Sequence, residues 1–177
     1  MNKIKEKIIE VALKTYTSKP PHEVTIEEIA KKVGVSKSLV LYYFENKGNL
    51  EKEVANYTFK QILKEWTEKI NSVKDLIDLS VKNFKELPNL LRFWAYISGK
   101  ALYYEKYEFF RDLFEDTMEI IIPLFEREEI TKPKKTAIAL MAMFDGLALY
   151  SLFYDIGDIE DYRKIAMEFV ECRRLKK

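Results

Sequence analysis

Cysteine and histidine are almost absent from this chain of 177 residues. One cysteine, Cys172, excludes an internal disulfide and a zinc site built from several cysteines. One histidine, His22, removes the usual partner for nucleophilic or metal chemistry. Acidic pairs do occur, but 29 acidic residues make such pairs expected on solvated surfaces. We therefore expect no enzyme activity, no metal site and no cofactor.

Glycine and proline are also scarce, with five of each and no low-complexity segment. Hydrophobic residues make up 47% of the chain, which is enough for a sizeable core in one or two domains. Apolar residues recur at intervals of three and four, and no segment alternates as a strand would. The pattern predicts an all-α fold.

Arginine is missing from the first sixty residues, which hold eleven lysines and eight acidic groups. This segment therefore carries a charge of +3, within a chain whose net charge is only +1. A broad positive field for nucleic acid is excluded, as is the bidentate contact of arginine with guanine from this segment. Any DNA binding here would depend on a few placed contacts, doubled by symmetry.

Residues 136–154 form the longest apolar run, interrupted only by Asp145. The length would allow a membrane span, but a central aspartate costs roughly 2.5–3.5 kcal/mol on insertion. We expect instead a helix buried on all sides, in a domain core and a subunit interface. The first ten residues alternate charged and apolar side chains too quickly for a signal peptide, which favours the cytoplasm and no membrane contact.

The segment from Thr25 to Lys47 has the spacing of a helix-turn-helix. Ala30 is the small residue where two helices approach, and Gly34 allows the turn between them. Thr25 and Glu28 predict a reciprocal capping box for the first helix, and Ser36 caps the second. Each signal is common by itself, and it is their joint fit that favours DNA binding.

Helical periodicity divides this segment into two faces. The inward face is predicted to hold Ile26, Ile29, Val33, Val35, Val40 and Phe44. The opposite arc of the second helix would meet phosphates and base edges through Lys37, Ser38, Leu39, Leu41, Tyr42 and Tyr43. Lys47 follows at the start of the next helix, where free amides also favour a phosphate.

The first sixty residues resemble the TetR family of transcriptional regulators. The resemblance rests on Ile4, Ile8, Ala12, Tyr16, Thr25, Ile29, Ala30, Gly34, Val35, Ser36, Tyr43, Phe44, Asn46, Lys47 and Leu50. It implies DNA contacts at Thr25, Ser36, Lys37, Tyr42, Tyr43 and Lys47, with Tyr43 and Lys47 chiefly on phosphate. The chain departs from the family pattern at Ser38, Leu39 and Leu41, which leaves the operator sequence open.

The expected organisation is a three-helix DNA-binding domain over residues 1–46, followed by a helical effector-binding and dimerisation domain over residues 47–177. About nine helices are expected in total. Later helices are expected from Lys47 to about Ile70, from Ser72 to before Pro88, from about Pro133 to Tyr154, and from Asp161 to Lys176.

Aromatic residues make up 14% of the chain and crowd its second half. They either fill the core or enclose an apolar pocket, and the resemblance, which implies a small-molecule effector, favours the pocket. The candidate ligand-binding residues are Trp66, Phe84, Trp94, Ile97, Phe110, Phe114, Met118, Met141, Phe144 and Asp145.

Pairing of two chains is expected because two-fold operators need two recognition helices about 34–36 Å apart. The resemblance implies that the last two long helices, roughly residues 133–154 and 158–176, form this homodimer. The function expected is a repressor that releases operator DNA when an apolar or aromatic effector binds. The alternative is an adaptor that presents a helix to a protein partner without binding DNA.

Overall fold

A computed structural model describes residues 3–86, 88–104 and 108–175 of the chain. These residues form nine α-helices, one short 3-10 helix and no strand, which confirms the all-α expectation. Among them, no helix is both long enough and apolar enough to cross a membrane.

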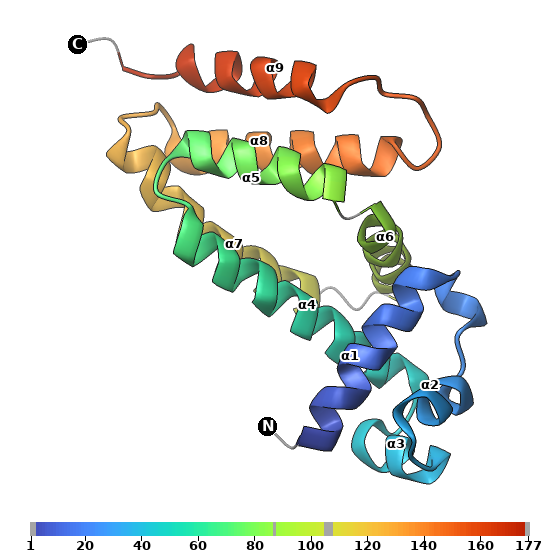
Figure 1. The fold of residues 1–177 in the computed structure, drawn as a ribbon. Helices are drawn as coiled ribbons and strands as arrows, with labels where there is room; N and C mark the ends of the chain where they lie inside the picture. Colours follow the sequence, from blue (N-terminus) through green and yellow to red (C-terminus); the bar gives the residue numbers. More distant parts are fainter. Residues whose placement is uncertain (1–2, 87, 105–107, 176–177) are drawn as a thin grey trace. The chain divides into compact units, whose positions relative to one another are not determined.

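Figure 1 shows the helices in chain order. The N-terminal elements are α1 (Lys3–Ser18), η1 (Pro21–Glu23), α2 (Ile26–Val33), α3 (Lys37–Phe44) and α4 (Lys47–Lys69). The remaining elements are α5 (Val73–Glu86), α6 (Pro88–Tyr103), α7 (Glu108–Arg127), α8 (Pro133–Tyr150) and α9 (Ile159–Glu171). The expected bounds of the fourth helix and the N-terminal start of α8 agree with these to within a residue.

The described residues divide into two compact units. The first holds residues 3–62 and 92–104, and thus joins most of α6 to the N-terminal helices. The second holds residues 63–86, 88–91 and 108–175. The expected boundary between residues 46 and 47 separates a DNA-binding role from an effector-binding and dimerisation role. It stays a prediction, because compact units do not report on those roles.

The first unit has a continuous apolar core drawn from α1 to α4 and α6. Its most deeply buried members include Ile8, Ile29, Val40, Phe44, Leu50 and Phe93. The ring of Tyr16 in α1 stacks on that of Phe93 in α6, with 5.3 Å between the ring centroids. Burial of rings of this size removes much apolar area from water and fixes how α6 lies against α1.

The second unit packs α7 against α8 and α5 against both α7 and α9 (Figure 1). Ser72 caps α5 by accepting a hydrogen bond from the amide of Asp75, 3.1 Å away, as its sequence position predicts. The end of α9 is tied to the α7–α8 connection, where the amide of Thr131 donates to the carbonyl of Arg173 at 2.8 Å.

Helix α8 differs from the expectation of burial on all sides. Its buried residues form one stripe, Thr136, Ala137, Leu140, Phe144 and Leu147, and the helix ends at Tyr150 rather than Tyr154. Asp145, Leu149 and Tyr150 are exposed. Within the single chain α8 packs on its neighbours along one stripe only, so burial on its remaining sides by a subunit interface stays a prediction. The predicted subunit interface would cover its other face.

The connection between α2 and α3 depends on one left-handed residue. Gly34 has φ of 84° and ψ of 34°, and its amide donates to the carbonyl of Ala30 at 3.0 Å. Val35 donates to the same carbonyl at 3.0 Å, which closes the end of α2. A side chain at residue 34 would meet no atom within 4 Å, so the constraint is purely one of backbone conformation.

We predict that Gly34→Ala lowers the free energy of unfolding by about 1 kcal/mol, because a Cβ disfavours the left-handed conformation. Gly99→Ala is the matched control. Gly99 also has open space around it but lies inside α6 with ordinary helical φ, so alanine should raise stability by roughly 0.5–1 kcal/mol. Urea unfolding followed by circular dichroism measures both changes. Equal effects of the two substitutions would contradict the role assigned to Gly34.

Candidate nucleic-acid interface

Both helices of the helix-turn-helix begin with the caps predicted from sequence. The hydroxyl of Thr25 accepts from the amide of Glu28, and that of Ser36 accepts from the amide of Leu39, both at 3.1 Å. The two hydroxyls therefore satisfy amides at the helix starts.

The second half of the predicted capping box is absent among the interactions described for Glu28. Its carboxylate instead contacts the ammonium groups of Lys19, at 2.5 Å, and Lys32, at 2.9 Å. Hydrogen bonds from these two lysines lower the pKa of Glu28. The two nearby ammonium groups attract the carboxylate more strongly than a neutral amide does, and through Lys19 the carboxylate joins α2 to the residue that follows α1.

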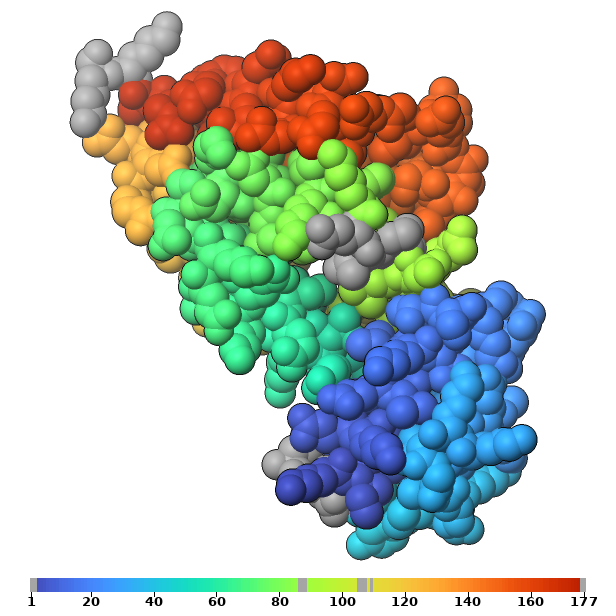
Figure 2. All heavy atoms as spheres, in the orientation of Figure 1, coloured from blue at the N-terminus to red at the C-terminus, as the bar shows by residue number. Residues whose placement is uncertain are grey.

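The inward face agrees with prediction at five of its six positions. Ile26, Ile29, Val33, Val40 and Phe44 are buried, whereas Val35 in the turn is only half-buried. Residues 25–45, light blue in Figure 2, contribute to the outer surface of the first unit. The buried set thus holds α3 in place while leaving its other side accessible.

The accessible side of α3 holds the predicted DNA-contacting residues. Lys37, Ser38 and Tyr42 are exposed, and Leu39, Leu41 and Tyr43 are half-buried. Tyr42 has 79% of its surface exposed, an unusual position for an aromatic ring. The rings of Tyr42 and Tyr43 meet edge to face, with centroids 5.4 Å apart. This surface offers hydroxyl, ammonium and apolar groups together, the mixture that phosphates, base edges and thymine methyl groups require.

The two predicted cationic contacts are already engaged within the protein. Lys37 forms an ion pair with Glu27. The hydrogen bond from Lys37 lowers the pKa of Glu27. Lys47 donates to the carbonyl of Pro21 at 2.9 Å and to that of His22 at 3.3 Å. Asn46 caps α4 beside it, accepting from the amide of Asn49 at 2.9 Å. Lys37 lies on the accessible side of α3, whereas the hydrogen bonds of Lys47 join the start of α4 to η1.

Sequence reasoning missed the partners of both lysines. Glu27 lies ten residues before Lys37, and no sequence periodicity joins positions on either side of a turn. Glu51 lies 3.7 Å from Lys47 and follows it by four residues, a spacing that does signal an ion pair on a helix.

The ten candidate effector residues are distributed over five helices and both units. Trp94 and Ile97 belong to the first unit, where Trp94 meets Phe59 edge to face. The other eight lie in the second unit. Of these, Trp66, Met118 and Phe144 are buried, Phe84, Phe110 and Met141 are half-buried, and Phe114 and Asp145 are exposed.

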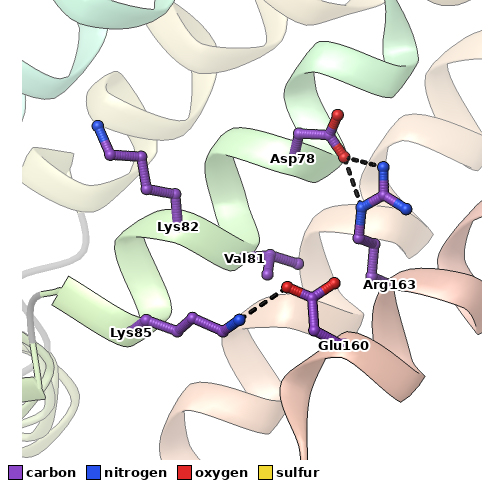
Figure 3. Close-up of a pocket in the computed structure, with 6 residues that line it drawn as sticks. All are labelled: Asp78, Val81, Lys82, Lys85, Glu160 and Arg163. Atoms are coloured by element: carbon purple, nitrogen blue, oxygen red, sulfur yellow. Dashed lines mark hydrogen bonds and ion pairs between the residues drawn. The ribbon is translucent and has the colours of Figure 1, made fainter.

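Two surface pockets in the described residues are lined by other side chains. The pocket between α5 and α9 has a volume of about 380 Å³ and is lined by Asp78, Val81, Lys82, Lys85, Glu160 and Arg163 (Figure 3). Arg163 pairs with Asp78 at 2.6 Å and Lys85 with Glu160 at 2.7 Å, so this groove is explained by ion pairs that join the two helices.

The second pocket lies on α6 and has a volume of about 570 Å³. Its lining is Ala95, Tyr96, Gly99, Lys100, Tyr103 and Tyr104. None of the ten candidate effector residues lines either pocket, and their role in ligand binding stays a prediction.

Comparison with solved structures shows that the fold is shared along the whole chain. A putative transcriptional regulator from Saccharomonospora viridis, solved in complex with choline, is 18% identical, with a TM-score of 0.78 over 100% of both chains. A TetR transcription regulator from Haloarcula marismortui is also 18% identical, with a TM-score of 0.78 over 99% of this chain and 100% of that one. A putative TetR-family regulator from Mesorhizobium loti is 23% identical, with a TM-score of 0.72 over 96% and 94% of the two chains.

The N-terminal sequence matches a family model. No functionally curated protein matches the chain. Residues 8–54, however, match the profile described as bacterial regulatory proteins, tetR family, and this range contains α2, α3 and both caps. The sequence match to the TetR family therefore covers residues 8–54, and for the rest of the chain the comparisons show the shared fold alone.

Proposed function

We propose that this protein is a transcriptional regulator that binds operator DNA through α3 and releases it when a small effector binds. The observation that carries the proposal is the outward face of α3, which a tight turn and two hydroxyl caps hold on the protein surface. The match to the tetR family profile at residues 8–54 covers the whole of this module. With DNA as the partner, the location that we propose is the cytoplasm.

The chemistry of α3 indicates how this surface would read DNA. Ser38 and Tyr42 offer hydroxyl groups to phosphates or base edges, and Leu39 or Leu41 would contact a thymine methyl group. Lys37 would exchange its ion pair with Glu27 for a phosphate. Because solvent screens exposed ion pairs, this exchange costs little. Specificity would then come from a few contacts without arginine, repeated in a second subunit.

A homodimer through α8 and α9 would supply that second recognition helix. Leu149 and Tyr150 at the end of α8, together with Phe153 and Tyr154 just beyond it, form a cluster of exposed apolar side chains. Ile165 in α9 is exposed as well. Exposed apolar groups clustered in this way are typical of surfaces that another chain covers.

The effector proposal is supported by the aromatic composition of the second unit and by the fold neighbour from Saccharomonospora viridis that holds choline. A small apolar or aromatic molecule is the effector class that we propose. Its binding would favour an arrangement of the dimer in which the two α3 helices no longer match the operator spacing. Repression is the direction proposed, with release on effector binding.

We predict that Lys37→Ala weakens binding to a selected genomic fragment and makes the slope of log affinity against log salt smaller by about one per subunit, because one phosphate contact is lost. Lys64→Ala is the matched control. Lys64 is likewise an exposed lysine in an ion pair, with Glu68 at 4.0 Å, but it lies outside the candidate interface. Gel shifts over a series of salt concentrations provide the measurement. An unchanged slope for Lys37→Ala would contradict the phosphate contact assigned to Lys37, whereas a parent protein that binds no fragment would favour the adaptor alternative.

We also predict that the protein sediments as a dimer at micromolar concentration and that Tyr154→Glu converts it to a monomer, because a charge would be buried in the interface. Tyr103→Glu is the control. Tyr103 is 81% exposed and Tyr154 is 70% exposed, so the two substitutions change similar surface side chains. Sedimentation velocity distinguishes the species. A monomeric parent protein, or monomers from both variants, would remove the assignment of this surface.

A further inference from the structure

A carboxylate is buried near the start of α4, at Glu51, which is only 1% exposed. Three donors surround it. Lys100 donates to one carboxylate oxygen, and the hydroxyl of Tyr96 donates to the other at 3.1 Å. The ammonium group of Lys47 lies 3.7 Å from that second oxygen. Two of the three donors therefore come from α6, and the third comes from the start of α4.

Burial makes these partners necessary. Removing a carboxylate from water costs several kcal/mol, which only nearby opposite charge and hydrogen bonds offset. Burial by itself lowers the pKa of Lys100, but the hydrogen bond to Glu51 and its charge outweigh this and raise the pKa overall. Lys100 consequently stays charged at neutral pH and remains bound to Glu51.

The ammonium group of Lys47 contacts Glu51 on one side and the segment before α2 on the other. It donates to the carbonyls of Pro21 and His22, which belong to η1, immediately before α2. A continuous set of polar contacts thus runs from α6 through Glu51 and Lys47 to η1. All of these residues lie in the first unit.

A further hydroxyl lies near this cluster without a hydrogen bond. The hydroxyl of Tyr16 is buried and has no partner among the described residues. Burial is the larger cause that raises the pKa of Tyr16, and the negative charge on Glu51 raises it further. The hydroxyl therefore keeps its proton, close enough to the carboxylate to interact with its charge. Because the ring of Tyr16 stacks on Phe93 of α6, a shift of α6 would move both this donor and the donors already bound to Glu51.

We propose that Glu51 is a positioning residue for operator binding. Its carboxylate holds the ammonium group of Lys47 at the start of α4, and the position of Lys47 thereby depends on Lys100 and Tyr96 of α6, which bind the same carboxylate. The inference rests on the proposed DNA-binding function. If Lys100 moves away, the carboxylate draws Lys47 more strongly toward itself and away from the carbonyls of η1. Tyr96 and Lys100 also line the pocket on α6, so a molecule in that pocket would contact two partners of Glu51 directly.

A double-mutant cycle on operator affinity tests the proposal. Lys100→Met in the full chain is expected to raise the dissociation constant for a selected genomic fragment by about fivefold, within the usual range of coupling between sites. In a Glu51→Gln background the same substitution should change affinity less than about twofold, since the neutral amide no longer draws Lys47 away. Equal fold-changes in the two backgrounds would overturn the proposal.

The control for a merely structural effect is Asp78→Asn, which breaks the ion pair with Arg163 in the second unit. It should lower the melting temperature without changing operator affinity. If Glu51→Gln fails to fold by circular dichroism, the cycle is run between Lys100→Met and Lys47→Ala, and the effect of the first should again vanish in the second. Parent protein that binds no selected fragment contradicts the proposed function itself, whereas parent binding with additive effects contradicts only the role of Glu51.

Discussion

The buried carboxylate of Glu51 imposes the strongest constraint on the first unit. An ion with almost no access to water needs donors on several sides, and among the described residues Lys47, Lys100 and Tyr96 provide them. Because two of these donors belong to α6, this helix must lie where its side chains reach α4. The grouping of α6 with the N-terminal helices follows from this electrostatic requirement together with the stacking of Tyr16 on Phe93.

The helix-turn-helix is stabilised differently, by signals that are local in sequence. Thr25 and Ser36 cap their helices, and Gly34 adopts a left-handed backbone conformation that other residues disfavour. Apolar side chains then bury one face and leave Lys37, Ser38 and Tyr42 on the other. These side chains are held on the surface by a local framework, and the polar contacts of Lys47 join the start of α4 to η1 and to Glu51 within the same unit.

These two kinds of stabilisation explain what the sequence predicted and what it did not. Caps, turn and helical periodicity act over three or four residues, so the helices, the inward face and the exposed side of α3 could be predicted. The pairs Glu27–Lys37 and Glu51–Lys100 join positions that only the tertiary fold brings together. We predicted α8 to be buried on all sides because its sequence is almost entirely apolar. An apolar sequence does not show which face of the helix a neighbour covers. The candidate effector residues were chosen by residue type, and the fold distributes them over both units.

Hydroxyl-radical footprinting of the full chain on a fragment selected from genomic DNA tests the central claim most directly. Recognition by α3 in a symmetric dimer predicts two protected segments related by two-fold symmetry, with centres about 34–36 Å apart along the DNA. The Tyr42→Ala variant should lose both segments together, since each depends on the same surface. Failure to enrich any fragment, or a single protected segment that persists in Tyr42→Ala, would contradict the account.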